Sequence, residues 1–283
     1  MASGPALEVV AGQVTAPGGT LTALTMNAGN SSTVRNADLN SAVFLLNTWA
    51  RNNAAGIWQI KSPKLHDNVQ GIRLRALATD PVPLMSRFTK QRLVPQDTLT
   101  LNLSGSAVGG QFEQAALLVY YGALPGANAR FITMDDLLKR TMNVWTTEIA
   151  ITPGVAGGYS GQVAINSTFD NFKANTDYAL VGYEVDTQCS VVGFTSPDFA
   201  NLRVGGPGIA NASTAGTSGR FRTAEWFLSL TREYGIPLIP VFNAANKFGT
   251  LVDIMQNQAG SAVNVTAILH ELAPVGGTGF SSM

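Results

Sequence analysis

Two stretches decide the fold class: DTLTLNLSGSAVGGQFEQAALLVYY at residues 97–121 and GTLVDIMQNQAGSAVNVTAILHEL at residues 249–272. Each contains a short strand-forming segment, then a loop of small polar residues with glycine, then a more apolar strand-forming segment. They lie about 150 residues apart, which predicts a chain made of two similar β halves. The alternative is chance, because unrelated strand pairs share this composition for generic reasons.

Strand signals continue outward from these stretches through both halves. Alternation at Ile72–Arg75 predicts a strand with one solvent-facing side, whereas the unbroken apolar run Ala115–Val119 predicts a strand buried on both faces. Short segments rich in β-branched or aromatic residues, bounded by Gly, Pro or Asn, predict the strands: Leu7–Val14, Thr20–Met26, Gly56–Ile60, Gly71–Ala78, Thr98–Leu103, Ala115–Tyr121, Val144–Ile151, Ser160–Ile165, Tyr178–Val185, Ser190–Phe194, Leu202–Val204, Leu238–Val241, Thr250–Met255 and Val263–Leu272.

Helical signals are few and short. Residues Asp38–Asn52 carry apolar side chains at helical spacing, and Thr223–Tyr234 does the same before a terminating glycine. Thr133 with Asp136 forms a capping-box pattern that predicts a helix to about Met142. Short helices among many strands argue against a doubly wound α/β sheet.

These elements predict an all-β chain of two tandem jelly-roll β-sandwiches with a few short helices. The predicted boundaries are a first sandwich over residues 1–130, a helical connector over 131–143 and a second sandwich over 144–283. The 283 residues suffice for one large or two ordinary cores.

Composition limits the class of function. Apolar residues make up 45% of the chain and charged residues only 13%, with 18 basic and 18 acidic residues. This balance indicates a surface partly covered by neighbouring subunits, the alternative being a monomer with a Ser/Thr/Asn-rich surface. One cysteine excludes an intramolecular disulfide, and the N-terminal residues lack the pattern of a signal peptide. We therefore expect folding in a reducing cytoplasm and no secretion through a signal peptide.

With these features the chain resembles the double jelly-roll major capsid proteins of tailless icosahedral viruses, especially membrane-containing bacteriophages. The resemblance rests on length, two similar β halves, short helices between late strands and the absence of a catalytic signature. It implies homotrimeric capsomers with a pseudo-sixfold outline, assembled in the host cytoplasm into a virion. The implied partners are further copies, other capsid proteins and an internal membrane or genome.

Two parts of the sequence are candidate contact surfaces. Basic residues concentrate in a stretch that we predict to face genome or lipid headgroups, although a run of solvated strand faces is the plainer explanation: Lys61, Lys64, Arg73, Arg75, Arg87, Lys90 and Arg92. Residues 205–219 predict a long exposed loop that contacts a neighbour or the host, with a plain linker as the alternative. Its candidate residues are Gly205, Gly206, Gly208, Asn211, Gly216 and Gly219.

The sequence predicts no catalytic, cofactor-binding or metal site. The two histidines, His66 and His270, stand in no nucleophile-elbow or zinc-binding motif. Cys189 has no basic neighbour in the sequence, so we expect an inert thiol. We therefore expect a structural protein without enzymatic activity, small-molecule substrate or cofactor.

Three alternatives remain from the sequence. The first is a β-sandwich module that binds glycans or a receptor, as a spike or lectin does. The second is a glycosidase whose paired carboxylates come from Glu148, Glu184 or Asp186. The third is the shell fold of tailed phages, which is disfavoured because the sequence shows no long helix.

Overall fold

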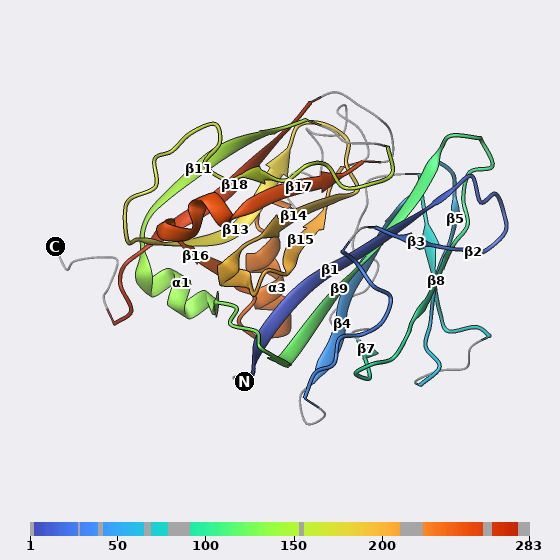
Figure 1. Cartoon of the computed structure of the whole chain (residues 1–283), viewed down its shortest axis with the longest axis horizontal. Coiled ribbons are helices and arrows are strands. Elements are labelled where there is room, and N and C mark those ends of the chain that lie inside the picture. The colour runs from blue at the N-terminus through green and yellow to red at the C-terminus, as the bar shows by residue number, and fades with distance from the viewer. Residues whose placement is uncertain are drawn as a thin grey trace.

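The computed structural model describes residues 3–27, 29–38, 42–64, 69–78, 91–152, 156–209, 223–256 and 262–276. Its strands pair antiparallel and form four sheets, two from each half of the chain (Figure 1). This confirms the predicted all-β class.

In the first half, a five-stranded sheet in the order β3-β1-β9-β4-β7 faces a four-stranded sheet in the order β2-β8-β5-β6. We call them the large and the small first sheet. The large first sheet contains β1 (Ser3–Thr15), β3 (Thr25–Met26), β4 (Val43–Arg51), β7 (Gln91–Arg92) and β9 (Phe112–Pro125). The small first sheet contains β2 (Thr22–Ala23), β5 (Gly56–Lys61), β6 (Ile72–Ala76) and β8 (Thr100–Leu103).

The second half repeats this plan with the orders β10-β16-β13-β18-β11 and β12-β17-β14-β15. The large second sheet contains β10 (Phe131–Ile132), β11 (Thr141–Ile151), β13 (Asp177–Val185), β16 (Ile239–Asn243) and β18 (Val263–Leu272). The small second sheet contains β12 (Val163–Ala164), β14 (Val191–Thr195), β15 (Arg203–Pro207) and β17 (Leu251–Met255).

The strand order is the same in both halves. With β3 and β10 set aside, the described part of each half has eight strands, which can be numbered one to eight along the chain. The large sheet then has the order 1-8-3-6 and the small sheet the order 2-7-4-5, in the first half and in the second. The two sequence stretches quoted at the outset supply the seventh and eighth strands of each half.

A β-bulge also recurs at the same place in both halves. In β4, Leu46 is an extra residue opposite Leu118–Val119 of β9. In β13, Val181 is an extra residue opposite Ile268–Leu269 of β18. A bulge interrupts the ladder at a defined residue, so its recurrence fixes the register between the halves. Leu118 and Ile268 therefore occupy equivalent positions.

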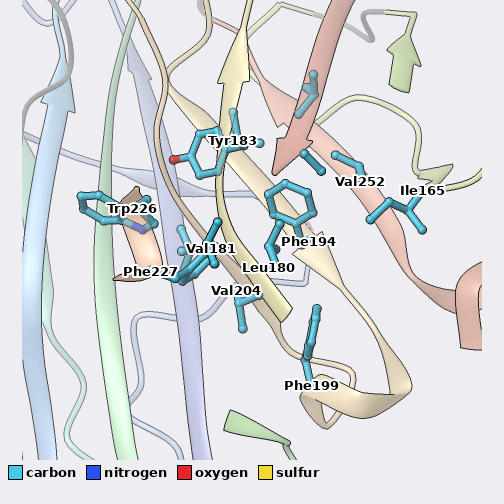
Figure 2. Close-up of a cluster of buried hydrophobic side chains, with 14 of the residues drawn as sticks. Ile165, Leu180, Val181, Tyr183, Phe194, Phe199, Val204, Trp226, Phe227 and Val252 are labelled. Atoms are coloured by element: carbon cyan, nitrogen blue, oxygen red, sulfur yellow. The ribbon is translucent and has the colours of Figure 1, made fainter. Parts of the chain in front are cut away.

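Each half buries an apolar cluster between its two sheets. In the first half, Trp58 of β5 and Leu101 of β8 share a cluster with Leu117 of β9. In the second half, Tyr183, Phe194, Val204, Phe199 and further residues gather in a larger cluster (Figure 2). Full burial of one such large side chain contributes about 2 kcal/mol to folding, so these clusters are the main source of stability.

Strand β9 lies in the middle of the large first sheet and is buried on both faces. Leu117 and Val119 belong to the first cluster, whereas Ala116 and Leu118 belong to the second. This confirms the prediction made from the run Ala115–Val119. The large first sheet is therefore a middle layer of the molecule, covered on both sides.

The short helices connect strands. Helix α1 (Met134–Arg140) begins after Thr133, whose hydroxyl accepts a hydrogen bond from the Asp136 amide at 3.1 Å, as the capping-box pattern predicts. Helix α3 (Trp226–Tyr234) ends at Gly235, which has a φ of 68°. Among the described residues, Pro197–Phe199 and Ala244–Gly249 form 3₁₀ helices. Within the described ranges, no helix has the length and apolar character needed to cross a membrane.

The predicted helix over Asp38–Asn52 is wrong, because residues 43–51 form β4. Leu45 of this strand belongs to the first cluster, whereas Leu46 and Trp49 belong to the second. The strand is thus buried on both faces, and its bulge shifts the alternation by one residue. Apolar residues then recur at a spacing of three and four, which imitates a helix.

The predicted connector over residues 131–143 contains more than a helix. Strand β10 pairs with β16, and Thr141 is already the first residue of β11. Only Met134–Arg140 is helical. The connector therefore contributes strands to the large second sheet as well as α1.

Candidate functional site

The two halves touch through the outer face of the large first sheet, the face turned away from its own small sheet. Leu7, Val9 and Ala11 of β1 lie there with Ala116 and Leu118 of β9, and each is at most 1% exposed. They share the second buried cluster, and β15 lies against β1 (Figure 1). We call these residues the internal face.

Buried hydrogen bonds fix the placement of one half on the other. Trp49 Nε1 donates to the Ser190 carbonyl at 2.9 Å, and its ring meets Trp226 edge-on with centroids 6.1 Å apart. Gln114 Nε2 donates to the Gln256 carbonyl at 2.9 Å. Buried polar groups are costly when unpaired, so these contacts favour one arrangement of the halves.

Paired charges lie beside the internal face. Arg203 Nη2 is 2.7 Å from Asp253 Oδ2, and its guanidinium lies 3.7 Å from the centre of the Tyr159 ring. Glu8 Oε1 is 2.6 Å from Arg35 Nη2. A cavity of about 160 Å³ between the halves is lined by Glu8, Val9, Gly29, Asn30, Arg35, Gln162, Thr195, Asn201, Leu202 and Arg203. Both arginines that line this cavity form ion pairs with carboxylates, so their charges are already compensated. We therefore interpret the cavity as part of the contact between the halves and not as a ligand site.

The outer face of the large second sheet is the counterpart of the internal face. The shared register gives these equivalent residues, the first half named first: Leu7 and Val144, Val9 and Thr146, Ala11 and Glu148, Ala116 and Thr266, Leu118 and Ile268. Val144 is 52% exposed, and the residues of β18 on this side are half-buried. We call Val144, Thr146, Glu148, Thr266 and Ile268 the external face.

Strand β11 is also a long edge strand. It has 11 residues and pairs with β18 on one side, and no described strand pairs with its other side. Unpaired backbone groups along such an edge invite association with another chain. Sequence reasoning predicted both strands but missed this face. The available signal was the alternation in Val263–His270, which contrasts with the unbroken apolar run of β9.

The structure brings together three of the seven predicted basic residues. Arg73 and Arg75 are exposed on β6, and Lys61 is half-buried at the end of the neighbouring strand β5. Gln59 pairs with Arg73 and Ile57 with Arg75, so alternation places all three cations on the outer face of the small first sheet. We call Lys61, Arg73 and Arg75 the basic face.

The other predicted basic residues do not join this face. Lys64 lies in the loop after β5, where its Nζ donates to the Gln96 carbonyl at 3.3 Å. Arg92 is exposed on β7, in the large first sheet. Arg87 and Lys90 lie outside the described residues.

The predicted loop over residues 205–219 is wrong at its beginning, because its first residues belong to β15. Gly205 and Gly206 are buried in β15, and Gly208 is buried directly after it. A Cβ on Gly206 would lie 2.5 Å from both Trp226 Nε1 and the Tyr183 hydroxyl. Glycine is needed here because side chains pack onto the bare strand. Three further loop candidates lie outside the described residues: Asn211, Gly216 and Gly219.

Charges also gather at the α1 end of the large second sheet. Asp177 accepts hydrogen bonds from Arg130 Nη1 at 3.0 Å and from Asn243 Nδ2 at 2.8 Å. Burial opposes ionisation of Asp177, but these hydrogen bonds outweigh it and lower the carboxyl pKa. An adjoining cleft of about 520 Å³ contains the Lys173–Glu271 ion pair. Its described charges are mutually paired, which is typical of a structural network.

The residues considered for chemistry are dispersed. Cys189 is fully buried, and burial raises the pKa of its thiol to about 12. His270 Nδ1 lies 2.9 Å from the Thr141 hydroxyl, and burial lowers the pKa of its imidazole. His66 lies outside the described residues. In the part of the chain that the structure describes, no three or more His, Cys, Asp or Glu side chains are grouped to hold a metal ion.

The proposed carboxylate pair of a glycosidase falls on the external face. Glu148 of β11 and Glu184 of β13 lie on opposite sides of Thr266. Asp186 follows β13, where its carboxylate accepts hydrogen bonds from the amide and the side chain of Asn264 at 2.9 and 2.8 Å. The two cavities described above are lined by other residues.

Comparison with known proteins leaves the family open. No family model matches the chain, and no curated protein matches it. Among solved structures, the crystal structure of the PBSX exported protein XepA aligns over 90% of this chain and 88% of that chain, with 11% identity and a TM-score of 0.22. A TM-score this low does not establish a common fold, so the architecture rests on the strand order itself.

Proposed function

We propose that this chain is a structural subunit of a viral shell, built from two jelly rolls, which self-assembles into trimeric capsomers of an icosahedral virion. Its function then resides in surfaces that bind other copies and other shell proteins. No catalytic step, cofactor or small-molecule substrate is part of this proposal.

The duplicated strand order carries the proposal. The orders 1-8-3-6 and 2-7-4-5 are what eight antiparallel strands adopt when they close two Greek keys into a jelly roll. The same order and the same bulge in both halves support a double jelly roll. Viral capsid proteins are a major class that uses jelly rolls, and a tandem pair in one chain suits a ring of six similar sandwiches made from three copies.

Surface chemistry supports assembly. Charged residues are only 13% of the chain, and exposed apolar side chains occur on the open edge strand β11, including Met142 and Val144. The halves are already joined face to face through apolar contacts. A protein with few charged residues and an open edge strand is prone to non-specific aggregation, and specific subunit contacts that cover the edge prevent it.

The test is the mass of the purified protein in solution, measured by size-exclusion chromatography with multi-angle light scattering and followed by negative-stain imaging of each peak. The proposal predicts a species of three times the 29.7 kDa chain mass, or larger closed particles. A monomer over a wide range of concentration and salt would contradict it.

The runner-up is a glycan-binding module, which one surface favours. Lys247 and Asp170 form an ion pair at 2.6 Å that joins the 3₁₀ helix Ala244–Gly249 to the loop that contains Asp170. Each of these segments presents an exposed aromatic ring, Phe169 at 53% in the loop and Phe248 at 68% in the 3₁₀ helix. Rings beside paired polar groups are a common way to bind sugars. A monomeric protein that binds immobilised glycans, and loses binding in Phe248→Ala, would replace the shell proposal.

A further inference from the structure

The contact between the halves provides a template for a contact between copies. Within the chain, the large first sheet packs its outer face against β15 of the small second sheet and against α3. Because both halves have the same strand order, each has one large and one small sheet available for such a contact. The internal contact uses the large sheet of the first half and the small sheet of the second.

One large-sheet face and one small-sheet face, each equivalent to a face used in the internal contact, are therefore not used within the chain. The external face on β11 and β18 matches the internal face position by position, yet within the described chain it is only partly covered. The outer face of the small first sheet, which carries the basic face, matches the small-sheet side of the internal contact. These two faces lie at opposite ends of the molecule (Figure 1), so one chain cannot join them.

Charge complementarity favours joining them between chains. The external face contains Glu148, exposed on β11, with Glu184 of β13 in the same row. The basic face contributes Lys61, Arg73 and Arg75. Opposite charges on facing surfaces steer association and exclude wrong partners. Two basic faces or two external faces would instead bring like charges together, which disfavours a two-fold contact.

We propose that the external face of one copy packs against the basic face of a second copy, in the same way that the small second sheet covers the internal face within a chain. The proposal rests on the proposed function and names the surfaces through which the copies meet. The contact is heterologous, so it propagates from copy to copy and closes into a ring when the rotation allows it. It assigns Arg73 and Arg75 to a protein contact instead of to genome or lipid.

Charge reversal tests this pairing in the full-length chain. Glu148→Arg and the double variant Arg73→Glu/Arg75→Glu should each weaken association by about 100-fold or more, because like charges then face each other. The triple variant with all three changes should restore assembly, since the charges are exchanged but still complementary. Arg92→Glu is the matched control, because Arg92 is exposed on a different sheet. Sedimentation velocity measures the masses, and circular dichroism checks that each variant is folded.

The outcomes separate this inference from the proposed function. A wild-type protein that stays monomeric overturns both. A wild type that assembles while the reversed variants assemble equally well overturns the pairing and leaves the shell function standing. Failure of the triple variant to recover also overturns the pairing. If Arg73→Glu/Arg75→Glu assembles normally but loses binding to single-stranded DNA or to phosphatidylglycerol vesicles, the basic face serves an anionic partner and the pairing is wrong.

Discussion

The internal and external faces occupy equivalent positions in two sheets of identical strand order, but their side chains differ. Where the internal face has Val9 and Ala11, the external face has Thr146 and Glu148. The internal residues are at most 1% exposed, whereas Thr146 and Glu148 are exposed. A face that is covered by its own chain during folding can be wholly apolar. Under the proposed pairing, the external face stays in water until another chain arrives and therefore needs polar side chains, which accounts for the difference.

The largest effect should come from placing a charge at matched positions of the two faces. Val9→Asp buries a carboxylate without a partner, which costs several kcal/mol and should prevent folding or leave an unstable protein. Thr146→Asp, at the equivalent exposed position, should change the free energy of unfolding by less than about 0.5 kcal/mol. Urea denaturation followed by tryptophan fluorescence measures both. Equal destabilisation by the two changes would refute the distinction between the faces.

Truncating the aromatic contact between the halves should have the next largest effect. Trp49→Ala removes the hydrogen bond to the Ser190 carbonyl and the edge-on contact with Trp226, and leaves a cavity. The expected loss is about 3–5 kcal/mol in the free energy of unfolding. Met142→Ala, on the edge strand β11 where Met142 is 52% exposed, is the control and should be nearly neutral. A small effect of Trp49→Ala in the same urea titration would mean that the internal contact contributes little.

A smaller effect is expected at Gly206 in the small second sheet, where the strand has no room for a side chain. Gly206→Ala pushes a methyl group against the Trp226 indole and the Tyr183 hydroxyl, and should cost about 1–3 kcal/mol. Gly161→Ala is the matched control, since its added Cβ meets nothing within 4 Å. Thermal unfolding by calorimetry compares the two variants. If Gly206→Ala melts at the wild-type temperature, the packing of Trp226 onto β15 is not as described.

The smallest effect is a pH dependence that arises beside the external face. Burial lowers the pKa of His270 in the folded chain, so the unfolded chain binds its proton more readily. Stability should therefore fall as the pH drops from about 6.5, the unfolded pKa, through the lower folded pKa, and then level off. Denaturation midpoints at pH 7.5 and pH 5.0 measure this loss, and His270→Gln should reduce it. An unchanged slope in the variant would assign the pH dependence to other groups.

Much of the fold could be predicted because its signals are local. Strand β18 was predicted with the bounds that the structure gives it, and the two-sided burial of β9 followed from its unbroken apolar run. The capping box at Thr133 identified α1. The strand order, by contrast, depends on pairings between distant segments, for which the sequence carried only the weak repeat.

The errors have a shared physical origin. Strand β4 imitates a helix because its bulge at Leu46 and its burial on both faces disturb the alternation. Gly205 and Gly206 suggested a loop, but a Cβ on Gly206 would meet the Trp226 indole and a Cβ on Gly205 would meet the Val192 carbonyl of the neighbouring strand. In both cases the cause is a tertiary contact from a distant residue. The candidate basic residues were identified from composition alone, and only the pairing of β5 with β6 showed which of them share a face.

On this account, the internal face is covered by its own chain and the external face by another copy. Hydrogen–deuterium exchange over a dilution series tests this most directly. Peptides from β1 should be protected at every concentration, because their cover belongs to the same chain. In β11, the amides that do not pair with β18 should exchange rapidly in the dilute protein and become protected in step with the rise in mass. Assembly that leaves exchange in β11 unchanged would contradict the account.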